Sequence, residues 1–265
     1  MYLPMTNDPN RVNTPHRAHP RPWTWLWPTW PGMAVPGLWA AYIAYAAMAG
    51  QFRSPREGIA ALWPAVLLYL GSCGLAACER RQHRPALTTL VVAGVALAAA
   101  DLAIKAWIEA TVAQARPLPA VPGLVAIDPV YNVYGTMLAI SGAKPFVTAL
   151  AVALVPLSVL GYRRYAVHDR PVAWADAAFL GLFAGALGKA GDLLLRGQVL
   201  DYLHIPGLPV ADLADVYLLW IGGGCALAAS LCYPDAWPDL RLPLRRLGRA
   251  VRRVWTKLSR GSGPR

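Results

Sequence analysis

Long apolar segments alternate with short polar loops along the 265 residues of this chain. A helix needs roughly 20 apolar residues to cross a hydrocarbon core of about 30 Å. Six segments approach that length, and they cover approximately residues 32–50, 59–78, 86–107, 146–162, 172–189 and 216–233. The fourth is short enough to lie at the membrane interface instead. The pattern predicts an all-α polytopic membrane protein with about six transmembrane helices.

A different pattern occupies the polar stretch between the third and fourth segments. Proline and glycine recur from Arg116 to Lys144, and between these breakers 124–127 and 130–134 read as two short strands. We expect them to form a small extracytoplasmic β-platform, whose exposed edge is suited to pairing with an extended peptide.

Composition supports the membrane assignment. Hydrophobic residues make up 56% of the chain and charged residues only 15%, which is too apolar for an ordinary soluble domain. A polar, proline-rich stretch precedes the first apolar segment, so that segment is predicted to be a spanning anchor and not a cleavable signal peptide.

The net charge of +11 follows the loops in a way that predicts topology and does not suggest a nucleic-acid partner. Basic residues gather in 79–84, in 163–170 and after Arg241, so every second loop is basic, as in cytoplasmic loops. Both termini are therefore expected in the cytoplasm. The stretches expected outside are 51–58, 108–145 and 190–215.

Four regions follow from these patterns. Residues 1–31 form a Pro- and Trp-rich cytoplasmic lead, and residues 32–85 form an apolar transmembrane hairpin that is expected to serve as a scaffold. The polar residues of interest lie in residues 86–233, and residues 234–265 form a basic tail. Apolar residues recur at helical spacing in that tail. It reads as an amphipathic helix on an anionic inner leaflet, or alternatively as a solvated basic tail.

Two carboxylates stand near the outer ends of apolar segments, Asp201 and Asp215. Ionised groups at the edge of a bilayer are costly and usually functional. Two aspartates that share a proton can also split an amide with water. We expect their carboxyl groups to lie within one water's reach of each other. The alternative is a pair of interfacial carboxylates that face water.

Further polar residues accompany this pair. Asp101 and Lys105 are four residues apart on one helical face, which suits either a functional or a purely structural ion pair. Asn132, in the external stretch, either orients a substrate carbonyl or serves as a turn residue.

The fifth apolar segment ends in Lys189-Ala190-Gly191-Asp192. Asp192 has three interpretations: a catalytic group, a helix-packing acceptor, or the partner of Lys189 or Arg196. Small residues at helical spacing allow another helix to approach this segment closely: Gly181, Gly185 and Gly188.

No sequence motif predicts a metal or a cofactor. The chain has no P-loop, no dinucleotide fingerprint and no zinc-type His–Glu pair, and its four cysteines lack metal-ligand spacing with histidine.

The order of these polar residues resembles the lipoprotein signal peptidase (signal peptidase II) family over about residues 86–232. The resemblance rests on Asp101-x-x-x-Lys105, Asn132 in an external loop, Gly-Ala-Leu-Gly-x-x-x-Asp192, Gly197-x-Val-Leu-Asp201-Tyr, and Ala214-Asp215 opening the last span. It implies a four-helix core in the bacterial inner membrane, with the active site facing outward.

The resemblance also implies roles. Asp201 and Asp215 fall on the catalytic pair, and Asp101, Lys105, Asn132 and Asp192 fall on supporting polar positions. Lys189 and Asp212 are further candidates for a supporting role, at positions where this chain departs from the family. It implies no metal and no cofactor. The implied partners are membrane lipids and a prolipoprotein substrate that carries a diacylglyceryl group on the Cys after the cut.

Three positions depart from the residues usual in that family: Lys189 and Asp212 each replace Asn, and Leu193 replaces Arg. Asp212 adds a third carboxylate beside the pair, which Lys189 or Lys105 is placed to offset. These departures leave open a non-catalytic relative that binds lipidated peptides or scaffolds partners. A proton-coupled transporter is a third interpretation, which predicts carboxylates near the bilayer midplane and a duplicated half.

Overall fold

The computed structural model describes residues 33–80, 85–112, 117–132, 144–166 and 173–232. The predictions made for the N-terminal lead and for the basic tail fall outside these residues, as do parts of the basic loops.

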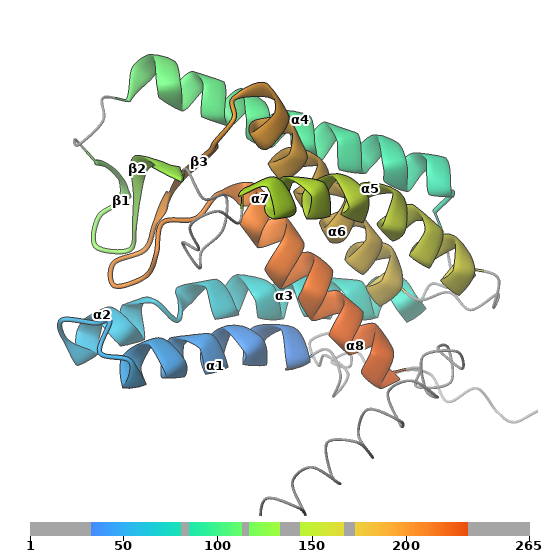
Figure 1. The fold of residues 1–265 in the computed structure, drawn as a ribbon. Coiled ribbons are helices and arrows are strands. Elements are labelled where there is room, and N and C mark those ends of the chain that lie inside the picture. Colours follow the sequence, from blue (N-terminus) through green and yellow to red (C-terminus); the bar gives the residue numbers. More distant parts are fainter. Residues whose placement is uncertain (1–32, 81–84, 113–116, 133–143, 167–172, 233–265) are drawn as a thin grey trace, which may run out of the picture.

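The described chain is mainly helical (Figure 1). Its helices are α1 Ala34–Met48, α2 Pro55–Ala60, α3 Trp63–Arg80, α4 Leu87–Thr111, α5 Lys144–Ala166, α6 Ala173–Leu195, α7 Leu213–Asp215, the π-helix η3 Val216–Gly223, and α8 Gly224–Cys232.

Each of the six predicted apolar segments forms a helix, which confirms the fold class. Within the described ranges, five helical stretches are long and apolar enough to cross a membrane: Pro55–Cys78, Leu87–Thr111, Lys144–Tyr165, Ala173–Leu195 and Leu213–Ser230. The sixth, α1, is apolar but has only 15 residues, fewer than the roughly 20 that a perpendicular span requires. The fourth predicted segment is longer than its sequence pattern suggested and is one of the five.

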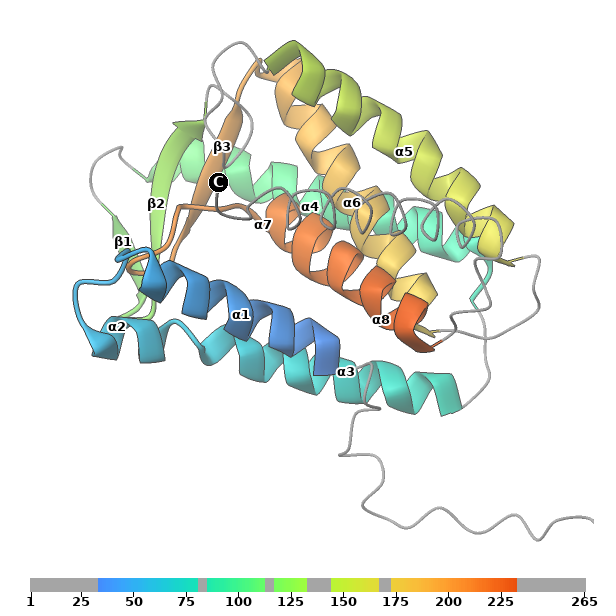
Figure 2. The same ribbon diagram turned by 60° about the horizontal axis from the view of Figure 1, so that its bottom comes forward.

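Helix α6 lies at the centre of the bundle, between α4 and α5 on one side and η3 and α8 on another (Figure 2). In its apolar window 67% of the residues are buried, compared with 11% in α5. Large apolar side chains of α5 such as Phe146 and Leu160 are exposed, as expected for a helix that faces lipid and not water.

A three-stranded antiparallel sheet lies at one end of the bundle, in the order β1 Leu118–Val121, β2 Val125–Asn132 and β3 Val199–His204 (Figures 1 and 2). The two short strands expected in this region form the single strand β2, and the register shifts where Pro129 interrupts it.

Strand β3 was not predicted. Its first four residues, Val199 to Tyr202, are all buried, so they lack the alternation of polar and apolar residues that marks a half-buried strand. This strand carries Asp201, and the sheet is therefore part of the site and not only a platform beside it.

The predicted close approach to α6 is provided by η3. A Cβ atom on Gly181 would lie 2.4 Å from the backbone nitrogen of Gly222, and one on Gly185 would lie 2.7 Å from the carbonyl oxygen of Ala214. Backbones that touch in this way leave no room for a side chain. The glycines thus bring the start of the last helical stretch, with Asp215, against α6.

We expect Gly181→Ala to destabilise the protein by about 1–3 kcal/mol, because the added methyl group overpacks the contact between α6 and η3. Thermal unfolding in detergent measures the effect. Gly161→Ala in α5 is the matched control, since its Cβ meets nothing within 4 Å. Equal melting temperatures for the two variants would contradict this account of the packing.

Candidate active site

All eight polar residues singled out in the sequence belong to one connected network at the sheet end of the bundle. They come from α4 (Asp101, Lys105), the end of β2 (Asn132), α6 (Lys189, Asp192), β3 (Asp201), and the start of the last helical stretch (Asp212, Asp215). Two lysines organise them into two clusters.

The deeper cluster surrounds Lys105, whose side chain is fully buried. Its Nζ lies 2.8 Å from Asp101 Oδ2 and 2.5 Å from Asp212 Oδ2, and it also donates to Asp192 Oδ2. A buried ammonium is tolerated only when it is paired and hydrogen-bonded. Asp192 and Asp212 accept hydrogen bonds from this ammonium, and Asp101 is its third ion-pair partner.

The shallower cluster surrounds Lys189. Its Nζ lies 2.9 Å from Asp215 Oδ1, 3.0 Å from Asp212 Oδ1 and 3.5 Å from Asp201 Oδ1. One carboxylate oxygen from each of the three aspartates lies within 4.8 Å of the others. The expectation that Asp201 and Asp215 stand within one water's reach is confirmed.

Asp212 joins the two clusters, because one of its oxygens contacts Lys105 and the other contacts Lys189. It is also the N-cap of α7, where Oδ1 accepts a hydrogen bond of 2.8 Å from the backbone nitrogen of Asp215. The same carboxylate thus sets the position of the backbone that carries Asp215.

Local backbone pairing explains how Asp201 meets Asp212. The chain turns after β3 and comes back, so that Leu203 and Ala211 exchange backbone hydrogen bonds of 2.7 and 3.0 Å. Asp212 is the residue after Ala211, so this pairing holds it beside β3, the strand that carries Asp201.

Asn132 is a site residue and not simply a turn residue. It ends β2, and its Nδ2 donates to Asp201 Oδ2 over 3.0 Å. The strand register explains the contact: Asp201 stands opposite Val130, so Asn132 is its diagonal neighbour on the same face.

The two aspartates that lie outside the membrane-spanning helices have opposite electrostatic environments. Burial raises the pKa of Asp201 above its ordinary value and Asp212 adds to the rise, while Lys189 and the amide of Asn132 oppose it. Burial also acts to raise the pKa of Asp212, but the ammonium groups of Lys189 and Lys105 outweigh it and lower that pKa. Of these two aspartates, Asp212 therefore favours the ionised form, and Asp201 has the higher proton affinity.

The donor set does not suit a metal ion. The carboxylates form two groups of three, Asp101, Asp192 and Asp212 in one and Asp201, Asp212 and Asp215 in the other. Each group already surrounds a lysine ammonium. A cation would have to displace that lysine from its buried position.

Further contacts extend the network, and those of Tyr202 and Glu109 were not foreseen. Tyr202 donates from its hydroxyl to Asp101 Oδ1 over 3.2 Å. Asp192 accepts from Arg196 Nη1 over 2.6 Å, and Arg196 also contacts Glu109 at 3.3 Å. Asp192 thus accepts a hydrogen bond from Lys105 of the neighbouring helix α4 and also pairs with Arg196, so both the helix-packing and the ion-pair interpretations are observed, the ion pair being with Arg196 and not with Lys189. The four-residue spacing from Asp192 to Arg196 was the sequence signal for this pair.

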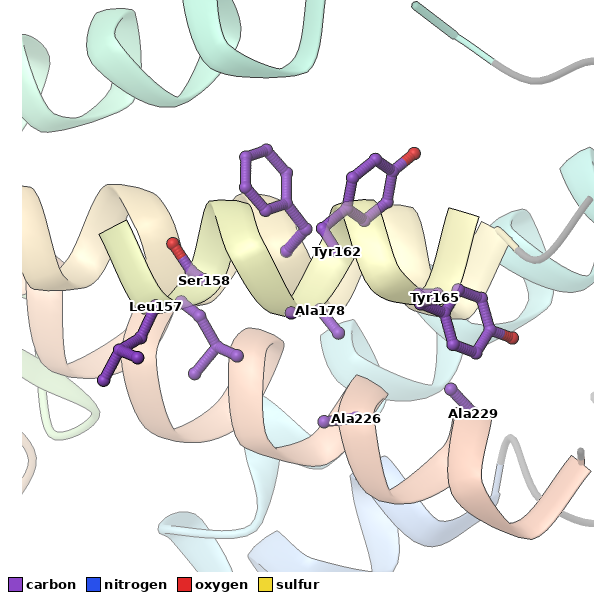
Figure 3. Close-up of a pocket in the computed structure, with 11 residues that line it drawn as sticks. Leu157, Ser158, Tyr162, Tyr165, Ala178, Ala226 and Ala229 are labelled. Carbon is purple, nitrogen blue, oxygen red and sulfur yellow. The ribbon is translucent and has the colours of Figure 1, made fainter. Parts of the chain in front are cut away.

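Asp215 lines a pocket of about 420 Å³ between α1 and the last helical stretch. A smaller pocket of about 140 Å³ lies between α5, α6 and α8 and is lined by Ser158, Tyr162 and Ala229, among others (Figure 3). It is near the start of α6 and the end of α8, whereas the aspartates lie at the opposite ends of these stretches. The larger pocket is the one that reaches the network.

Comparison with known proteins bears on this site. A family model described as Signal peptidase (SPase) II matches residues 93–232, more than half of the chain. The chain belongs to the signal peptidase II family.

Individual relatives agree with this assignment. The lipoprotein signal peptidase of Bifidobacterium longum subsp. infantis is 34% identical over 169 residues, covering 60% of this chain and 89% of the relative. That of Thermosynechococcus vestitus is 34% identical over 145 residues, covering 49% of this chain and 87% of the relative.

A solved bacterial membrane enzyme has a TM-score of 0.49 and 24% identity, covering 56% of this chain and 91% of that one.

Membership of the signal peptidase II family favours the peptidase interpretation over the non-catalytic and transporter alternatives. It also gives the departures a structural meaning. Lys189 and Asp212, which both stand where the family usually has Asn, contact each other at 3.0 Å. The two replacements therefore introduce opposite charges that neutralise each other inside the site.

We expect Lys189→Asn and Asp212→Asn each to lower the free energy of unfolding by about 3–5 kcal/mol, because each removes one member of a buried ion-pair network and leaves its remaining members less well compensated. The double variant should lose less than the sum, with a coupling of about 0.5–3 kcal/mol. Chemical unfolding in detergent measures all three. Lys144→Asn, at an exposed lysine that begins α5, is the control. Strictly additive losses would show that the two charges do not compensate each other.

Proposed function

We propose that this protein removes signal peptides from prolipoproteins by acid–base hydrolysis, with Asp201 and Asp215 as the catalytic pair. Family membership supports the reaction. The mechanism is supported by one observation above all: carboxylate oxygens of both residues lie within 4.8 Å of each other and of Asp212. Asp215 also lines a pocket.

A shared proton follows from the charges of the network. Five carboxylates face two lysines and Arg196. This excess of negative charge in a buried site raises the proton affinity of the least compensated carboxylates. Asp212 contacts both lysines, whereas Asp215 and Asp201 contact only Lys189 of the two, at 2.9 and 3.5 Å, so the proton resides on the Asp201–Asp215 pair, which titrates as a unit.

The reaction then proceeds without a covalent intermediate. The ionised carboxylate of the pair takes a proton from a water molecule placed between the two, and the oxygen of that water bonds to the scissile carbonyl carbon. The protonated carboxylate donates a hydrogen bond to the carbonyl oxygen. As the C–N bond breaks, a proton passes to the leaving nitrogen. Each positioned acid or base contributes about 10²–10⁴-fold to the rate.

One oxygen is free for this task. Asp201 Oδ2 is held by Asn132, whereas Oδ1 is buried, has no hydrogen-bond partner among the described residues, and has Lys189 only at 3.5 Å. Buried polar oxygens of this kind are uncommon and often have a catalytic role. Asn132 and Lys189 thus act as positioning residues for the pair.

The location of the site suits a lipid-modified substrate. Asp201 lies on β3, and Asp212 and Asp215 lie at the start of the last helical stretch, and Figure 1 shows that β3 and α7 adjoin where the helices meet the sheet. The acyl chains of a diacylglyceryl group on the Cys after the cut can therefore remain in hydrocarbon while the peptide reaches the pair. Residues of β1, at the edge of the sheet, are all exposed, and such an edge can pair with an extended peptide.

Replacing either member of the pair tests the mechanism. We expect Asp201→Asn and Asp215→Asn each to reduce kcat by about 10²–10⁴-fold, because each removes one acid–base group. The measurement is cleavage of a diacylglyceryl-modified prolipoprotein by the protein purified in detergent. Asp128→Asn is the matched control, since Asp128 lies on β2 and contacts His204 at 3.6 Å, outside the network. A variant of the pair that cleaves like the control would overturn this mechanism.

We further propose that the protein resides in the bacterial inner membrane with both termini in the cytoplasm and the aspartates facing outward. Arg163 and Arg164 support this orientation, because they are exposed in the last turn of α5, whose first turn lies at the sheet end.

Reporters fused after Arg265 test the orientation. Green fluorescent protein at this position should fluoresce and alkaline phosphatase should be inactive, since the first works in the cytoplasm and the second only outside it. Active phosphatase with a dark fluorescent fusion would invert the proposed topology.

A further inference from the structure

The N-terminal hairpin of α1, α2 and α3 precedes the segment that matches the signal peptidase II family, yet it forms part of the pocket that reaches Asp215. The pocket of about 420 Å³ is bounded by Leu38, Trp39 and Tyr42 of α1 and, opposite them, by Leu208, Leu219 and Trp220. This volume lies within the range of about 300–1,000 Å³ that is usual for ligand sites.

The α1 wall is rigidly built. Trp39 stands edge-on to Trp220 at 4.7 Å between ring centroids, and Tyr42 lies 5.7 Å from Trp220. Trp39 Nε1 donates to the carbonyl oxygen of Ala61 over 2.9 Å, which ties α1 to the start of α3. Aromatic contacts of this kind add to the stability that burial supplies. The wall is therefore preformed and not a loose lipid-facing surface.

The hairpin is also joined to the segment that carries the aspartates. Gly207, with a φ of +80°, makes the turn between β3 and α7, and a Cβ there would lie 2.3 Å from the ring of Phe52. Leu208 belongs to the same buried cluster as Trp39 and Ile43. The loop that leads to Asp212 thus rests on the hairpin, as the position of α1 and α2 in Figure 2 indicates.

The lining of the pocket favours hydrocarbon over peptide. Apart from Asp215 at its end, it is lined almost entirely by apolar and aromatic side chains, and the indole N–H of Trp39 is already used. A peptide backbone placed there would lose its hydrogen bonds to water without gaining others, whereas an acyl chain has none to lose. Leu38 and Leu219 are 37% and 45% exposed, so the pocket opens between helices toward the surrounding lipid.

We propose that this pocket holds one acyl chain of the substrate's diacylglyceryl group, with α1 as the wall that determines which chains fit. The inference rests on the proposed role of Asp215, because the chain would extend from a cysteine whose peptide bond lies at that carboxylate. It gives the N-terminal hairpin a part in substrate selection in addition to its part in the scaffold.

Narrowing the pocket tests the assignment. Leu38→Trp places a larger side chain at the mouth, and we expect it to reduce the preference of kcat/KM for a long-chain over a short-chain diacylglyceryl substrate by about tenfold, the value of roughly two buried methylene groups. Tyr45→Trp is the matched control. Tyr45 is on the same helix, 60% exposed and outside the pocket lining, so its variant should keep the wild-type preference.

The outcomes separate the two proposals. If Leu38→Trp depresses cleavage of both substrates equally, or alters selection among side chains of the signal peptide, the acyl-chain assignment is overturned while the aspartate mechanism stands. If wild-type protein cleaves neither substrate, the proposed function itself fails.

Photocrosslinking does not require cleavage, so it tests the pocket even if the wild-type protein cleaves neither substrate. A lipidated peptide with a photoreactive diazirine near the middle of one acyl chain should label α1 within residues 34–48 of the full-length protein. Leu38→Trp should reduce this labelling, and Tyr45→Trp should not. Labelling confined to α5, the most lipid-exposed helix, would refute the pocket.

Discussion

The rest of the site depends on the two ion pairs that the carboxylate of Asp212 makes. This carboxylate receives Lys105 on one oxygen and Lys189 on the other, and it caps the helix that carries Asp215. A single buried charge thus links α4, α6 and the last helical stretch. Because a buried ion pair is stable only when every member is satisfied, the positions of these three elements are tied to one another at the point where the chemistry is proposed to occur.

Buried charge also explains why the site carries more aspartates than a catalytic pair requires. Lys105 is fully buried, and three carboxylates compensate its charge, Asp192 and Asp212 as hydrogen-bond acceptors and Asp101 as an ion-pair partner. Asp201 and Asp215 share the second lysine, Lys189, with Asp212, so negative charge still exceeds positive charge at the pair, which favours retention of one proton. The supporting network and the proposed acid–base function therefore rest on the same electrostatic balance.

The N-terminal hairpin shows how a small scaffold acquires a larger binding surface. Its aromatic side chains pack against Trp220, and Phe52 packs against the turn at Gly207. Both contacts lie next to the segment that precedes Asp215. A hairpin that precedes the segment matched by the family model thus lies where it borders the approach to the proposed catalytic pair, and not on a distant lipid-facing surface.

The sequence by itself determined the helices and the identity of the polar residues. Apolar segments of nearly 20 residues predict spans, and the ordered motifs from Asp101 to Asp215 predict which side chains belong to the site. Only the tertiary structure decided that Asp201 lies on a strand, that Asn132 holds it, and that Lys189 and Asp212 neutralise each other. Lys105 meets Asp192 and Asp212 across separations of 87 and 107 residues. Such contacts leave no local periodicity, because they arise where separate helices and strands are packed together.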